Sequence, residues 1–154
     1  MTEHEGEWSK DDGRRGTDDG RGTTEDEQLA AYPVCRGVRG ATTASANTRE
    51  AILEATADLI QRLVAANDIQ TEDIASVMFS TTPDLTAEFP AVVRTQIGWQ
   101  DVALECYQEM GVPGALQRCI RVLIHWNTRR SMRETVHVYV RGAEGLRPDR
   151  VKSS

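Results

Sequence analysis

Residues 119–126, CIRVLIHW, carry the sharpest hydrophobic pattern in the chain. Side chains alternate between two faces along a strand, so every second residue shares a face. One face here is wholly apolar: Ile120, Val122, Ile124 and Trp126. The other places Arg121 among Cys119, Leu123 and His125. A guanidinium stays protonated, and an unpaired buried charge costs about 3–5 kcal/mol, so we expect Arg121 to reach solvent, pair with a carboxylate or bind an anion.

A helical pattern runs from Asn47 to Asp68. Its apolar residues recur three and four positions apart, which forms one stripe along a helix: Ile52, Ala55, Leu59, Ile60, Leu63 and Val64. Asn47 can cap the first turn, with Glu50 three residues later completing a capping box. We predict an amphipathic helix that packs on a sheet and carries no chemistry of its own.

Shorter patterns fill the rest of the chain. Strands are predicted near residues 32–43, 76–80, 99–110 (running into a loop) and 135–142, and a short helix at 90–98 that starts at Pro90 and closes at Gly98. The alternation of strands and helices predicts an α/β domain, with one mixed sheet backed by helices. The length of 154 residues suits a single domain, which we place at residues 32–150.

Charge is concentrated at the N-terminus. Residues 1–30 hold ten acidic and four basic side chains, which accounts for the whole net charge of −6. This stretch also has five of the 12 glycines and one aromatic residue, Trp8. Such a composition buries too little apolar surface to offset its ordering entropy, so we predict a disordered acidic tail at 1–31 and a flexible end at 151–154. The near-neutral remainder gives no electrostatic case for nucleic acid as a partner.

Several function classes lack their sequence signals. The three cysteines have no CxxC spacing, and the three histidines are scattered, so neither a disulfide framework nor a metal site is predicted. No glycine-rich phosphate loop is present. No apolar run is long enough to span a bilayer, and the N-terminus has no signal-peptide pattern. We expect a cytoplasmic protein with no membrane partner, no metal and no cofactor.

Seven short motifs occur in a fixed order: RGVRGATT (36–43), TPDLTAEFPA (82–91), GWQ (98–100), CYQEM (106–110), RCIRV (118–122), HVY (137–139) and LRPD (146–149). Together they resemble the monofunctional, trimeric, Bacillus-type class of chorismate mutase. The resemblance implies a homotrimeric pseudo-barrel with active sites at the subunit interfaces. It implies the rearrangement of chorismate to prephenate, a step in aromatic amino acid biosynthesis by the shikimate pathway.

The resemblance also implies roles for nine residues. Arg121, Glu109 and Arg39 match the catalytic positions: a donor to the ether oxygen of the breaking bond, the carboxylate that holds the substrate hydroxyl, and an arginine for a substrate carboxylate. The remaining positions match substrate-binding residues, of which Phe89 and Arg94 belong to the wall supplied by a neighbouring subunit: Cys106, Tyr139, Phe89, Arg94, Leu146 and Arg147.

Two alternatives remain open from the sequence. The first is a metabolite-binding trimer on the same scaffold that does not catalyse the reaction. Its support is the stretch from Phe89 to Arg94, which is one residue shorter than the family pattern and has Val92 where a basic residue is common. The second is a trimeric imine or enamine deaminase, although CYQEM and LRPD do not fit that class.

Overall fold

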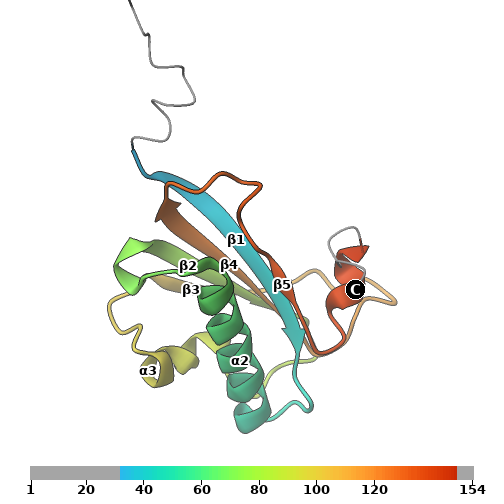
Figure 1. Cartoon of the computed structure of the whole chain (residues 1–154). Helices are drawn as coiled ribbons and strands as arrows, with labels where there is room; N and C mark the ends of the chain where they lie inside the picture. Colours follow the sequence, from blue (N-terminus) through green and yellow to red (C-terminus); the bar gives the residue numbers. More distant parts are fainter. Residues whose placement is uncertain (1–31, 149–154) are drawn as a thin grey trace, which may run out of the picture.

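The strand β4 (Cys119–Thr128) lies in the middle of a five-stranded sheet. The structure, a computed structural model, describes residues 32–148. The strand order is β3–β2–β4–β1–β5, with β1 at Val34–Thr43, β2 at Ile74–Thr81, β3 at Leu104–Gln108 and β5 at Val138–Tyr139 (Figure 1). β4 is antiparallel to both β1 and β2, whereas β3 and β5 join the two edges in parallel. The predicted mixed α+β sheet is therefore confirmed.

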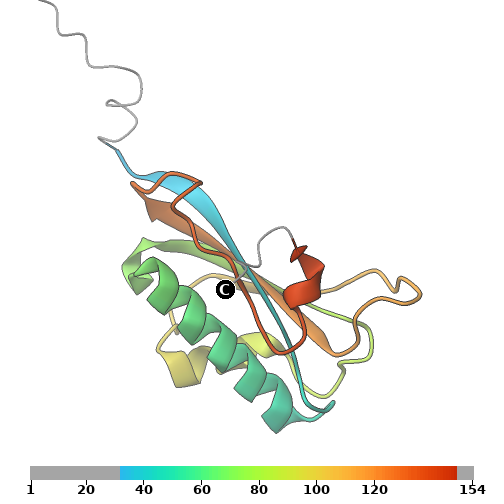
Figure 2. The same cartoon turned by 45° about the vertical axis from the view of Figure 1, so that its right-hand side comes forward.

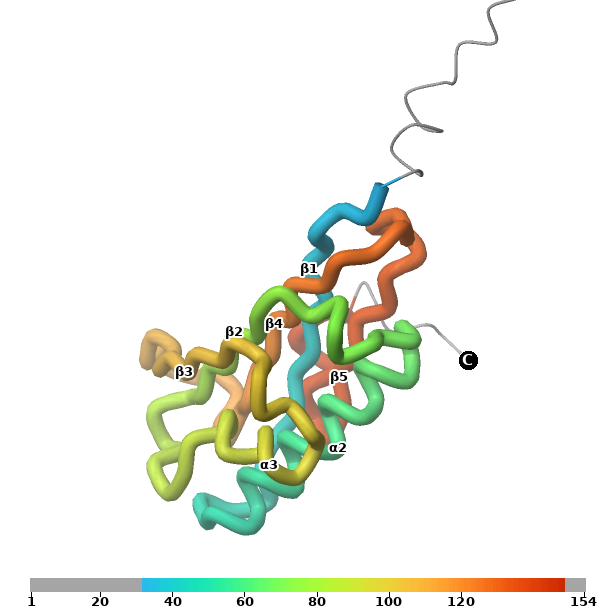
Figure 3. The backbone as a smooth tube through the Cα atoms, turned by 90° about the vertical axis from the view of Figure 1, so that its left-hand side faces the viewer, coloured from blue at the N-terminus to red at the C-terminus, as the bar shows by residue number. Residues whose placement is uncertain are grey.

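The long helix α2 (Arg49–Asn67) covers one face of this sheet, as Figures 1 and 3 show from two directions. Its apolar stripe packs on the apolar face of β4, where Val122, Ile124 and Trp126 are buried. The side chain of Thr48 accepts the N–H of Ala51 and caps the helix. The predicted cap, Asn47, instead binds the 86–87 backbone, because its amide oxygen accepts two N–H groups of that loop.

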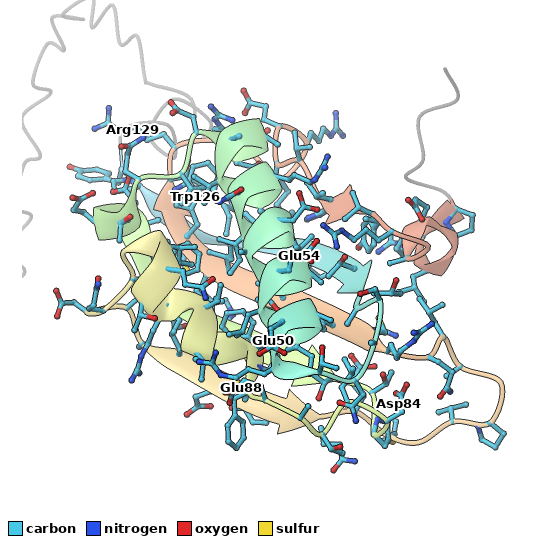
Figure 4. The ribbon with its side chains drawn as sticks, turned by 90° about the horizontal axis from the view of Figure 1, so that it is seen from below. Glu50, Glu54, Asp84, Glu88, Trp126 and Arg129 are labelled. Atoms are coloured by element: carbon cyan, nitrogen blue, oxygen red, sulfur yellow. The ribbon has the colours of Figure 1, made fainter. Side chains whose placement is uncertain are left out.

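The helix predicted at 90–98 is present in two parts. Pro90–Val93 forms a 3₁₀ helix and Arg94–Ile97 forms the single α-helical turn α3, which Gly98 closes in the left-handed conformation. The loop before it is tied to α2 by an ion pair of 2.9 Å between Arg49 and Glu88. Figure 4 shows Glu88 and Glu50 near the first turn of α2, and Asp84 and Trp126 toward opposite ends of the sheet. Another 3₁₀ helix, Thr71–Asp73, leads into β2.

The second face of the sheet carries a smaller apolar cluster. Buried Ala41, Cys119 and Ala143 form its centre, and partly buried Tyr139 and Leu146 pack against it. Leu146 belongs to the 3₁₀ helix Glu144–Leu146, which Figure 2 shows (red) on the side of the sheet away from α2. The strand predicted at 135–142 is much shorter than expected, because only Val138–Tyr139 pair with β1.

Parts of the predicted domain organisation fall outside the described residues. The acidic tail at 1–31, the last two residues of the domain at 149–150 and the C-terminus at 151–154 all do so. Among residues 32–148, no helix has the length and apolar character that a bilayer-spanning helix needs.

Candidate active site

A pocket of about 280 Å³ opens on the face of the sheet opposite α2. The alternation in β4 explains its position: Val122 and Ile124 point into the core, so Arg121 and Leu123 point the other way. Five of the nine predicted site residues line it, and they come from three separate parts of the chain: Arg39, Arg121, Tyr139, Leu146 and Arg147. The structure therefore brings together three guanidinium groups that the sequence separates.

Arg121 pairs with a carboxylate of its own chain. Its Nε lies 2.9 Å from Oε1 of Glu109, and the hydroxyl of Ser80 donates to the same oxygen at 2.6 Å. Glu109 follows β3, and its backbone N–H donates to the Thr81 carbonyl, so the β2–β3 pairing continues to that residue. The Arg121 side chain is 46% exposed. Of the three expectations for this charge, the single chain therefore shows two, contact with solvent and a carboxylate partner.

Arg39 is held by Tyr139 on the neighbouring strand. Its Nη2 donates to the Tyr139 hydroxyl at 3.3 Å, and its backbone N–H donates to Nδ1 of His137 at 3.1 Å. The parallel pairing of β1 with β5 makes this possible, because Ala41 and Tyr139 are register partners. The arginine and the tyrosine thus form one wall of the pocket.

Leu146 and Arg147 reach the pocket through a turn after β5. Arg141 and Gly142 have φ values of 55° and 91°, which reverse the chain direction. The Arg141 guanidinium is fixed to α2 by ion pairs with Glu54 at 3.3 Å and Asp58 at 3.2 Å. This anchoring sets where the following 3₁₀ helix places Leu146.

Cys106 and Phe89 lie in a different pocket of about 310 Å³. In β3 the side chains alternate, so Cys106 and Tyr107 point to opposite faces. Burial raises the pKa of the Cys106 thiol, against a smaller opposing effect of the Ala91 backbone, so the thiol stays protonated at neutral pH. Arg94 is exposed at the first position of α3 and lines neither pocket. Within one chain, these three residues are not gathered with Arg121.

Sequence reasoning missed two polar residues of the site. Ser80 shares a strand face with Ser76, and two hydroxyl side chains on one face of a strand were a usable signal. Tyr107 lies inside the CYQEM motif and lines both pockets, so it stands between Arg121 and Phe89. Neither was singled out, because the resemblance assigns them no role.

The chemistry of this pocket is that of anion binding. Three guanidinium groups and one carboxylate suit a small ligand with several anionic groups and a hydroxyl. Among residues 32–148, no three His, Cys, Asp or Glu side chains gather in a way that could hold a metal ion. Fold and site therefore define a binding or catalytic protein for a small polyanion.

Comparison with known proteins narrows this class of protein to one family. The profile of the family "Chorismate mutase type I" matches residues 35–150. The chain is 48% identical to the chorismate mutase AroH of Thermus thermophilus and 44% identical to that of Bacillus subtilis strain 168, in each case over 115 residues, or 74% of this chain and 94% and 91% of the relatives. A solved structure of the chorismate mutase from Clostridium thermocellum is 41% identical, with a TM-score of 0.71 over 72% of this chain and 99% of that one. This chain belongs to the type I chorismate mutase family, which confirms the resemblance found in the sequence.

Proposed function

We propose that this protein catalyses the intramolecular rearrangement of chorismate to prephenate. The observation that carries the proposal is the pocket in which Arg121, paired with Glu109, faces Arg39 and Arg147. Chorismate is a dicarboxylate that also bears a hydroxyl and an ether oxygen. Several guanidinium groups and one carboxylate complement that set of groups, and family membership supports the same reaction.

The reaction needs no nucleophile, no proton transfer and no cofactor. A protein can still accelerate it in two ways: by holding the substrate in its compact reactive conformation, and by placing fixed donors where charge develops as the C–O bond breaks. Arg39 and Arg147 serve the first purpose by binding carboxylates. Arg121 serves the second by donating to the ether oxygen.

Glu109 has two tasks in this proposal. Its contacts with Arg121 and Ser80 both use Oε1, so Oε2 takes part in neither and can accept from the substrate hydroxyl. The contact of Glu109 with Nε also fixes the plane of the Arg121 guanidinium. Because the group is planar, this plane sets the directions in which its two terminal nitrogens donate. Tyr139 and Leu146 complete the wall of the same pocket.

The assembly we propose is a homotrimer whose neighbouring subunit supplies Phe89 and Arg94 to each site. Two observations support it. Phe89 is 69% exposed and Met110 is 86% exposed, which is costly for large apolar side chains in a lone chain. Tyr107, which lines the pocket around Arg121, is also 45% exposed, so a second chain packed against it would close the pocket. Sedimentation of the purified protein should give about three times 17.1 kDa.

One assay tests the reaction. Purified protein is mixed with chorismate, and loss of its ultraviolet absorbance is followed together with the appearance of prephenate. We expect saturable turnover. Saturable binding without turnover would instead indicate a metabolite-binding protein on this scaffold.

We also place the protein in the cytoplasm. The support is the spacing of the cysteine residues, which predicts no disulfide, together with free cysteines at positions 35, 106 and 119 in the structure. Fractionation of cells that express the tagged full chain tests this placement.

A further inference from the structure

The backbone of β1 forms hydrogen bonds with the segment that contains the short strand β5, and in one of them the acceptor is a side chain. Val140 donates its N–H to the Ala41 carbonyl at 3.0 Å, as expected for a parallel ladder. Arg39 is two residues before Ala41, so its N–H points to the same neighbour. There it meets the Nδ1 atom of the His137 ring at 3.1 Å, and the imidazole takes the place of a backbone carbonyl.

The same segment also binds the other end of Arg39. Tyr139, two residues after His137, accepts from the Arg39 guanidinium at 3.3 Å. Arg39 is therefore held at its backbone by His137 and at its side chain by Tyr139. Just before His137, the amide of Asn67 on α2 binds both polar backbone groups of Val136 at 2.8 Å. These contacts fix where the 136–139 segment lies against β1.

We propose that His137 is a positioning residue, whose neutral Nδ1 fixes the backbone at Arg39 and so sets the place of that guanidinium in the pocket. The kinetic consequence of this inference rests on the proposed function. Its structural consequence rests on the geometry alone. Only an unprotonated Nδ1 can accept a hydrogen bond. An imidazole ordinarily takes up a proton near pH 6.5, within the range in which an enzyme can be assayed.

Protonation of His137 would act on Arg39 in two ways. The Arg39 N–H would lose its acceptor, and a second cation would stand beside the Arg39 backbone. The groups that could modify this titration are carried by β1, by α2 and by the segment itself: Arg36, Arg39, Glu54, Asp58, Arg62, Asp68, Arg133, Glu134, Tyr139 and Arg141. The carboxylates of Glu54 and Asp58 are already paired with Arg141 and Arg62.

Two substitutions separate this role from simple packing. In His137→Asn the side-chain amide oxygen lies close to where Nδ1 was and can accept the Arg39 N–H, but it does not titrate. In His137→Ala no acceptor remains. His125→Asn is the matched control, because the Nδ1 of His125 contacts the Ser76 hydroxyl at 2.8 Å instead of the Arg39 N–H.

The first measurement is the backbone amide signal of Arg39 in a ¹H–¹⁵N spectrum of the full chain, followed from pH 5 to pH 8. We expect it to move with pH in the native protein and in His125→Asn, and to stay fixed in His137→Asn. A signal that does not respond to pH in the native protein overturns the proposal. This result does not depend on catalysis.

The second measurement is the pH dependence of kcat and KM for chorismate. Arg39 binds a carboxylate that is present throughout the reaction, so its displacement weakens binding more than it slows the chemical step. Since a hydrogen bond contributes a net 0.5–1.5 kcal/mol, we expect His137→Ala to raise KM about 3- to 10-fold, with kcat changed less than about twofold. We expect His137→Asn to restore KM and to remove its rise at acid pH.

The outcomes separate the two proposals. If the native protein does not turn over chorismate but the Arg39 signal follows His137, the proposed function fails and the positioning role stands. If turnover is normal and His137→Ala is folded with an unchanged KM at every pH, the positioning role is wrong and the proposed function stands.

Discussion

Arg121 and Glu109 form an ion pair within one chain, with 2.9 Å between Nε and Oε1. Arg121 lies in β4 and Glu109 directly follows β3, and β2 separates these two strands in the sheet. Ser80 of β2 lies between them in the sheet and donates to the same carboxylate oxygen. Strands β4 and β2 and the residue after β3 thus each supply one polar group to this cluster beside the pocket.

The first prediction concerns the charge of Glu109. Glu109→Gln keeps the size of the side chain but removes the negative charge that orients Arg121. We expect kcat for chorismate to fall about 10- to 100-fold, because a charge-assisted bond of about 1.5–3 kcal/mol is lost from a group that acts in the transition state. Steady-state kinetics at saturating chorismate measures it.

Ser80→Ala is the matched control for this change. It removes one neutral donor to Glu109 and leaves the ion pair in place. We expect a loss of less than about tenfold, in line with a net hydrogen-bond contribution of about 1 kcal/mol. Equal losses in both variants would show that the charge of Glu109 has no special role.

The second prediction concerns Gly40, which follows Arg39 in β1. A Cβ atom at Gly40 would lie 2.8 Å from Leu63 Cδ1, 2.9 Å from Leu59 Cδ1 and 3.1 Å from the Val138 carbonyl oxygen. Because α2 and β5 both approach this point, we expect Gly40→Ala to destabilise the fold by about 1–3 kcal/mol. Chemical denaturation at a fixed protein concentration measures the change.

Gly145→Ala is the comparison for that experiment. Within the described residues, a Cβ atom there would meet nothing within 4 Å. We expect its free energy of unfolding to stay within about 0.5 kcal/mol of the native value. A Gly40→Ala protein as stable as Gly145→Ala would contradict the close approach of α2 to β1.

The third prediction is a dependence of stability on acid pH at Asp84. Burial would raise the pKa of this carboxyl, but hydrogen bonding, including that from the Arg118 N–H, and the positive charge of Arg118 lower it below its ordinary value of 3.8. The Arg118 bond is 2.7 Å long. A depressed pKa stabilises the folded state above the unfolded value, and this contribution is lost as pH falls through the folded value.

The experiment compares Asp84→Asn with the native protein from pH 6 down to pH 2.5. We expect the native protein to be more stable at pH 6, and the difference to shrink below about pH 4, where the native carboxyl takes up its proton. Glu72→Gln, which changes an exposed carboxylate of the 3₁₀ helix Thr71–Asp73, serves as control. A difference that stays constant with pH would contradict the charged state of Asp84 as its cause.

The sequence predicted those features that depend on local periodicity. The two faces of β4 and the stripe of α2 follow from spacing alone, and the structure has both. Capping was harder, since Asn47 and Thr48 are both good caps and only the contact of Asn47 with the 86–87 loop decides between them. The extent of β5 depends on pairing with a distant strand, which periodicity does not report.

In the candidate site too, local features could be predicted from the sequence and contacts between distant segments could not. Arg121 stood out because a cation interrupts an apolar strand, which is a local signal. Its partner Glu109 could not be deduced from spacing, because the contact depends on the strand order β3–β2–β4. The positions of Phe89 and Arg94 relative to an active site do not follow from one chain, because the residues that they are proposed to face belong to another subunit.

The last prediction concerns Arg121 itself. If its guanidinium donates to the ether oxygen as negative charge develops there, Arg121→Ala should lower kcat far more than it raises KM. Loss of one preorganised donor to developing charge typically costs about 100- to 1000-fold in kcat. Arg121→Lys should recover little, because a point charge on a flexible stem cannot pair with Glu109 and the ligand as a planar group does.

Replacement of Arg121 by citrulline is the sharper test of the charge. Citrulline has nearly the same shape and still donates hydrogen bonds, including one from the position of Nε, so the geometry that Glu109 imposes is kept. In the single chain the Arg121 side chain is 46% exposed, and water there screens its charge. The charge therefore acts most strongly if a neighbouring subunit covers the pocket. In the proposed trimer we therefore expect citrulline at position 121 to lower kcat nearly as much as alanine, measured with chorismate at saturation. If the citrulline protein keeps near-native turnover, the charge of Arg121 does not act in catalysis, and its pair with Glu109 is a structural contact.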